Sequence, residues 1–112
     1  MEPTSENQRS AARSREQRRA DLALVTGYHE AQLAKLLERV RDGLRRFEAG
    51  EISAFEVDEL IHHYKRAARE LWKFCGDVSG TRVRFTARAL EELGQGADSI
   101  DWWDRGNPKS PR

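Results

Sequence analysis

The chain has 112 residues, of which 35% are charged and 38% belong to the hydrophobic types, and this length suits one small domain. The formal net charge is only +1, which argues against a dedicated polyanion binder, because such proteins need an excess of basic side chains. The single cysteine, Cys75, excludes an internal disulfide and any metal motif built on a cysteine pair.

No apolar run approaches the roughly 20 residues that a membrane-spanning helix needs. The N-terminal stretch also lacks the apolar middle of a secretory signal. We therefore expect a cytoplasmic protein that does not associate with membranes.

The first segment, residues 1–17, is polar and shows no apolar periodicity. Its arginines and those that follow directly are Arg9, Arg13, Arg15, Arg18 and Arg19. Such a composition cannot bury enough apolar surface to offset the entropy lost on ordering. We predict a disordered basic arm over residues 1–17, with a frayed extension of the next helix as the alternative.

The second segment, from about residue 18 to 48, has the apolar spacing of an amphipathic helix. Its apolar side chains recur mostly at intervals of three and four, at Leu22, Val25, Leu33, Leu36, Leu37, Val40, Leu44 and Phe47. The pattern continues past Gly27 and Gly43, each of which weakens a helix by up to about 1 kcal/mol relative to alanine. We predict one long helix that closes with Gly50 as a left-handed cap.

The next helix has the clearest start signal in the chain. Ser53 and Glu56 have the spacing of a capping box, and Ile52 and Val57 have that of a hydrophobic staple. Gly76 marks the end. We predict a second helix over about 54–75, which forms a long hairpin of the coiled-coil type with the first.

Residues 81–93 have two interpretations. TRVRFT alternates like a short strand, whereas RFTARALEELG is typical of a helix. A lone strand has no partner in a helical chain, so we predict a shorter third helix over about 81–93. The fold class is all-α, with a helical domain over 18–95 and a mostly irregular tail over 96–112 that is expected to be flexible.

The paired histidines and the cysteine do not form a site within their helix. At about 100° per residue, Cys75 returns to the apolar face, whereas His62 and His63 point away from it in different directions. His62 and Cys75 are also about 20 Å apart along the axis. We interpret Cys75 as a small buried hydrophobe, with a redox or cross-linking thiol as the alternative, and suggest that His63 pairs with Glu59.

The face of this helix opposite the apolar stripe collects basic side chains. We call them the basic ridge: His62, Arg66, Arg69 and Lys73. A solvated helix face is the simpler interpretation, and the functional one is a docking surface for an acidic protein or a phosphate backbone. Glu70 lies beside the ridge and disfavours nucleic acid.

Trp102 and Trp103 stand out in a polar tail. They can clamp the tail onto the helices, which is the interpretation we favour, or bind a partner, because tryptophan is enriched at binding hot spots. The apolar surface of the second helix is also wide, since Trp72 and Phe74 flank it. The third helix, the tail or a second subunit must therefore cover what a hairpin leaves exposed.

Catalytic and metal-binding motifs are missing from the sequence: there is no P-loop, GxGxxG, HExxH or nucleophile elbow. Asp98, Asp101 and Asp104 are spaced by three, but the glycine and glutamate of a calcium loop do not follow. We expect no enzyme, no cofactor, no metal and no small-molecule substrate.

Two functions from different classes fit these features. The first is a small non-enzymatic helical module for protein–protein interaction, such as an adaptor or regulatory subunit. It would use the basic ridge with Trp102 and Trp103, and a protein partner or a homodimer would support its small core. The alternative is a nucleic-acid-associated regulator or antitoxin-like protein, whose binding residues would be Arg13, Arg15, Arg18, Arg19, Arg82, Arg84 and Arg88.

Two stretches resemble short uncharacterised helical proteins of actinobacteria: HHYKRAARELWKFCG at 62–76 and DWWDRG at 101–106. The resemblance extends over roughly residues 33–106. It implies a bacterial helical protein and brings no activity and no site residue with it.

Overall fold

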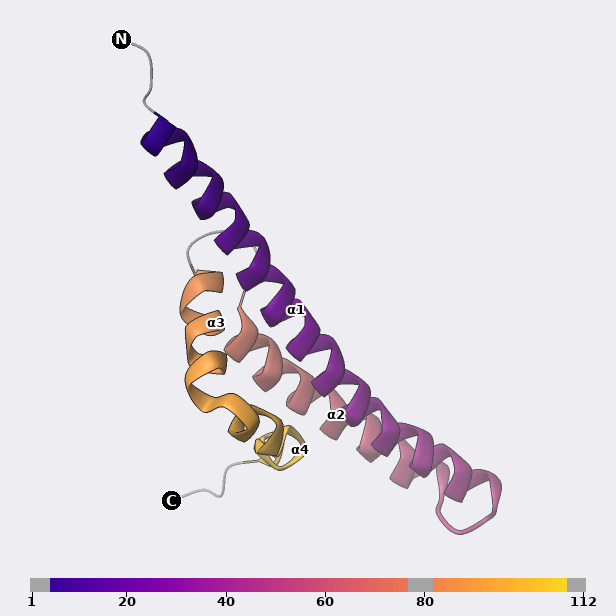
Figure 1. The fold of residues 1–112 in the computed structure, drawn as a ribbon. Coiled ribbons are helices and arrows are strands. Elements are labelled where there is room, and N and C mark those ends of the chain that lie inside the picture. The colour runs from indigo at the N-terminus through magenta and orange to yellow at the C-terminus, as the bar shows by residue number, and fades with distance from the viewer. Residues whose placement is uncertain (1–4, 77–81, 109–112) are drawn as a thin grey trace.

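The computed structural model describes residues 5–76 and 82–108 and shows an all-α fold (Figure 1). The helices in chain order are α1 (Ser5–Glu48), α2 (Ala54–Cys75), α3 (Arg82–Leu93), the 3₁₀ helix η1 (Gly94–Ser99) and α4 (Trp102–Arg105). α1 and α2 form an antiparallel hairpin, and α3 and α4 lie along one side of it. Within the described ranges, no helix is long and apolar enough to cross a membrane.

The turn between α1 and α2 begins with a Schellman cap. The N–H of Gly50 donates to the carbonyl of Phe47 at 3.0 Å, and the N–H of Glu51 donates to that of Arg46 at 2.8 Å. Gly50 has a φ of 77°, which glycine adopts without the steric cost of a Cβ. The predicted role of Gly50 is confirmed.

α2 begins with the predicted capping box. The Ser53 hydroxyl accepts a hydrogen bond from the N–H of Glu56 at 3.2 Å, and the Glu56 carboxylate accepts one from the N–H of Ser53 at 3.4 Å. The helix ends at Cys75, and Gly76 follows with a φ of 70°. The predicted bounds of this helix are confirmed.

α1 begins at Ser5, well before the predicted start near residue 18. From Ser5 onward the structure shows the alternative to a disordered arm, an extension of the helix, and residues 1–4 lie outside the described residues. Low apolar content predicts only that the side chains of a segment are not buried in a core. The described side chains of this segment are indeed almost all exposed. Alanine, arginine, glutamine and glutamate are nevertheless good helix formers, and extending an existing helix needs no new nucleation.

α3 matches the predicted third helix and excludes a strand at residues 82–86, while residue 81 lies outside the described residues. Its N-terminus adjoins the C-terminal end of α2. The Arg82 guanidinium donates to the carbonyl of Lys73 at 3.4 Å. A positive charge is unfavourable at the N-terminus of a helix and favourable at the C-terminus. The contact of Arg82 with the C-terminal end of α2 therefore offsets the cost of its position at the start of α3.

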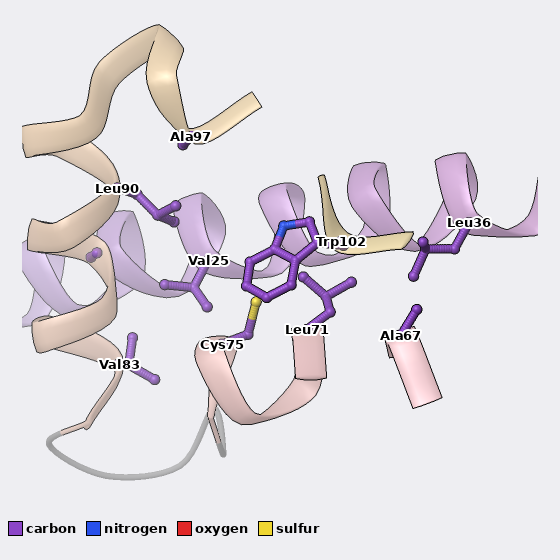
Figure 2. Close-up of a cluster of buried hydrophobic side chains, with 10 residues drawn as sticks. Val25, Leu36, Ala67, Leu71, Cys75, Val83, Leu90, Ala97 and Trp102 are labelled. Atoms are coloured by element: carbon purple, nitrogen blue, oxygen red, sulfur yellow. The ribbon is translucent and has the colours of Figure 1, made fainter. Parts of the chain in front are cut away.

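The core lies where the hairpin, α3 and the tail meet. Its buried residues are Val25, Leu36, Ala67, Leu71, Cys75, Val83, Ala87, Leu90, Ala97 and Trp102. In Figure 2 the Trp102 indole lies among Val25, Leu71 and Cys75, and it is only 3% exposed. The tail that was predicted to be mostly irregular contains two short helices, η1 and α4, and contributes Ala97 and Trp102 to this core.

We expect Trp102→Ala to lower the free energy of unfolding by about 3–5 kcal/mol, the usual cost of truncating a buried tryptophan. Urea unfolding followed by circular dichroism measures this loss. Phe85→Ala serves as the control, because Phe85 is 74% exposed and its loss should change stability by no more than about 0.5 kcal/mol. Equal losses in the two variants would contradict a clamping role for Trp102.

Candidate interaction surfaces

The basic ridge lies on the solvent-facing side of α2, as its spacing predicts, and all four side chains are exposed. Two of them contact a carboxylate within the helix. His62 Nε2 lies 3.4 Å from the Asp58 carboxylate, and Lys73 Nζ lies 3.2 Å from the Glu70 carboxylate. Exposed pairs of this kind contribute little stability, but they reduce the positive charge that the ridge presents to a partner.

The tail engages the same helix and uses part of the ridge. Arg66 Nε donates to the carbonyl of Gly106 at 2.9 Å. His63 Nε2 lies 2.6 Å from the carbonyl of Trp103, and its ring stacks on the indole with centroids 4.0 Å apart and planes 16° apart. His63 therefore contacts the tail, and the suggested pairing with Glu59 is replaced by this contact.

The two tryptophans of the tail have different environments. Trp102 Nε1 donates to the Tyr28 hydroxyl at 2.9 Å, and that hydroxyl donates to the carbonyl of Ala97 at 2.8 Å. Burial raises the pKa of Tyr28, and the hydrogen bond from Trp102 opposes the rise. Trp102 is therefore an internal clamp and not an exposed partner-binding residue, whereas Trp103 is only half-buried, with Arg39 5.4 Å from its ring centroid.

A shallow groove lies between α2 and α4. Its charged lining residues are four basic and two acidic, namely Arg66, Arg69, Lys73, Arg105, Glu70 and Asp104. The Arg105 guanidinium also lies 4.9 Å from the Trp102 ring centroid. The groove is thus moderately basic, and part of its positive charge already serves the fold.

The arginines predicted to bind nucleic acid lie on two helices. Arg13 lies in α1, where Arg15, Arg18 and Arg19 are exposed. On α3, Arg84 and Arg88 are exposed as well. Arg82 is engaged with the end of α2, so it has a structural role.

The cysteine and the remaining histidine are partly or fully enclosed. Cys75 is 0% exposed, and burial raises its pKa to about 11, which confirms the prediction of a small buried hydrophobe. A buried thiol that stays protonated at neutral pH is a poor nucleophile. Burial also lowers the pKa of His29. In the part of the chain that the structure describes, no group of three or more His, Cys, Asp or Glu could hold a metal ion.

One side of the α1–α2 hairpin carries exposed apolar side chains that the sequence analysis did not identify as a site. On α1, Leu37 and Leu44 are 48% and 44% exposed, and on α2, Trp72 is 57% exposed. At about 100° per residue, Leu37 and Leu44 lie roughly 80–100° from buried Leu36, and Trp72 lies roughly 100° from buried Leu71. With their half-buried neighbours they form what we call the open face: Leu33, Leu37, Val40, Leu44, Ile61 and Trp72.

The open face lies opposite the side that the tail covers. Tyr28 and Arg39, which contact the tail, lie roughly 60–80° from Leu36 on the other flank of α1. His63 lies roughly 80° from Leu71 on the corresponding flank of α2, where it contacts Trp103. In Figure 1, α3 and α4 accordingly lie on one side of the hairpin only.

Comparison of the chain with protein-family models, with curated proteins and with solved structures found no match. The resemblance of residues 62–76 and 101–106 to helical proteins of actinobacteria therefore stays a prediction. What the structure defines is a helical hairpin that carries a clamped tail on one side and an apolar surface on the other.

Gly106 lets the end of α4 approach α2 closely, because a Cβ there would lie 2.7 Å from the backbone nitrogen of Ala67. We expect Gly106→Ala to lower the free energy of unfolding by about 1–3 kcal/mol, as overpacking does. Gly96→Ala is the matched control, since a Cβ at Gly96 would meet nothing within 4 Å. Chemical denaturation compares the two, and equal stabilities would contradict the close packing of α4 on α2.

Proposed function

We propose that this protein is a small non-enzymatic helical interaction module, an adaptor or regulatory subunit, that binds another protein chain through the open face. The observation that carries this proposal is the exposure of Leu37, Leu44 and Trp72 on one side of the hairpin. Single exposed apolar side chains are normal on proteins. Several apolar side chains on the same side of two packed helices are instead typical of a docking surface.

Trp72 is the main anchor of this surface. Full burial of a large apolar side chain contributes about 1.5–3 kcal/mol, and tryptophan is among the residues that dominate binding energy. More than half of Trp72 is exposed, so a partner gains a large part of that contribution. Trp72 is therefore the tryptophan that we propose for partner binding, whereas Trp102 is buried as the internal clamp that the sequence analysis favoured.

Three reactive side chains among the described residues support a non-enzymatic role, because they serve the fold. Tyr28 is hydrogen-bonded to Ala97 and Trp102, His63 holds the tail, and Cys75 is buried with a raised pKa. An unpaired cysteine is also compatible with the reducing cytoplasm, where we place the protein.

Nucleic-acid binding receives less support. Arg66 and Arg82 donate to backbone carbonyls of the chain itself, and the formal net charge is only +1. Affinity that rests on phosphate contacts falls steeply with salt, whereas an apolar interface is much less sensitive. Salt dependence therefore separates the two functions.

The proposal is tested with a tagged protein purified from its own cells, together with an untagged copy expressed alongside it. We expect Leu37→Glu to reduce the amount of every co-purifying protein about tenfold, because it would bury an unpaired carboxylate in the interface, which is costly. Quantitative mass spectrometry measures these amounts. Phe55→Glu is the matched control, since Phe55 is 84% exposed and points about 160° away from the buried stripe of α2. It should change nothing.

The wild-type capture should also survive nuclease treatment and high salt. If Leu37→Glu retains the same chains as the wild type, the open face is not the binding surface. If the captured material is nucleic acid that salt removes, the regulator becomes the better explanation.

A further inference from the structure

We infer that the chain covering the open face is a second copy of this protein, so that two hairpins form a four-helix assembly related by a two-fold axis. This inference rests on the proposed function of the open face. It goes further by naming the partner and the axis that relates the two copies.

The first observation is a self-complementary charge pair on α1. Glu30 and Arg41 are both exposed, and at about 100° per residue both lie at the outer edge of the open face, within roughly 40° of Leu37. Neither forms an ion pair in the described residues. They are eleven residues apart, or about three turns. A two-fold axis midway between them sets Glu30 of each copy against Arg41 of the other.

The second observation is an apolar pair on α2 with the same separation. Ile61 and Trp72 belong to the open face and are also eleven residues apart. In an antiparallel contact of α2 with its mate, an axis between Arg66 and Ala67 sets Trp72 of each copy against Ile61 of the other. The exposed indole is then covered by an aliphatic side chain.

The register of the hairpin makes these two axes the same axis. A Cβ on Gly43 would meet the side chain of Leu60, so these positions face each other across the hairpin. Seven residues before Gly43 in α1 is Leu36, and seven residues after Leu60 in α2 is Ala67. Because the helices are antiparallel, Leu36 and Ala67 also lie opposite each other, and both are buried in the core (Figure 2). The midpoint of the charge pair and that of the apolar pair therefore lie opposite each other.

One two-fold axis thus satisfies both helices at once, and it brings Leu37 close to its own symmetry mate. A two-fold interface uses the same surface on both subunits, so its contacts must repeat about the axis. An unrelated partner imposes no such internal symmetry on the surface that it binds. The symmetric pattern is therefore what favours a second copy over a foreign chain.

The test is sedimentation analysis of the purified full chain up to about 100 µM, a range that detects weak association. We expect a dimer for the wild type and a monomer for Leu37→Glu. Glu30→Arg and Arg41→Glu should each weaken association about tenfold. Each variant sets like charges at positions 30 and 41 against each other, and the two-fold axis makes this contact occur twice in the dimer. The double variant Glu30→Arg/Arg41→Glu should restore it to within about threefold, since the exchanged pair is again opposite in sign.

Glu38→Arg is the control, because Glu38 is exposed on the side of α1 away from α2 and should leave association unchanged. Circular dichroism confirms that each variant is folded, and the recovery in the double variant is itself a control for folding. A wild type that stays monomeric, or a double variant weaker than both single variants, overturns the inference. If the wild type is monomeric while Leu37→Glu still loses a captured protein, the proposed function stands with a foreign partner, and if neither depends on Leu37, both fall.

Discussion

The burial of Trp102 against the hairpin is the contact on which the order of the C-terminal tail depends. α4 has only four residues, far too few for a helix that is stable alone, so tertiary contacts must hold it. The buried indole supplies the apolar area, and its N–H bonds to Tyr28. Once Trp102 is fixed, Trp103 reaches His63 and the carbonyl of Gly106 reaches Arg66. The order of the tail therefore follows from one side chain.

This one-sided clamp also explains why the hairpin has an uncovered surface. Each long helix carries apolar side chains over a wider arc than the stripe that faces the other helix, and a two-helix hairpin buries only that stripe. α3 and the tail cover one flank, where Tyr28 and Phe74 pack against the core. No described element covers the flank that carries Leu37 and Trp72. The same excess of apolar surface thus accounts for both the clamped tail and the open face.

The sequence was sufficient wherever a structure is encoded locally. The bounds of α2 are fixed by Ser53, Glu56 and Gly76. The rotation of about 100° per residue places Cys75 on the apolar face, and hence in the core. For residues 1–17 the sequence favours a disordered arm over an extension of the helix, because apolar spacing is missing there. The structure shows the extension from Ser5 onward, since helix propensity does not require burial. The sequence analysis favoured Trp102 as an internal clamp, and its burial agrees with that interpretation. The exposure of Trp72 could not be predicted, because only tertiary placement decides which flank of the hairpin the tail covers.

The charges of the chain acquire a different meaning once they are placed on the fold. Much of the basic ridge is engaged with Asp58, Glu70 and the tail, so its positive character is partly structural. The free pair of Glu30 and Arg41 borders an apolar surface instead. Apolar burial supplies most of the affinity at an interface, whereas charges at its edge select the partner and set the register. In the inferred dimer, Leu37 and Trp72 supply the apolar burial, and the pair of Glu30 and Arg41 sets the register of the two copies.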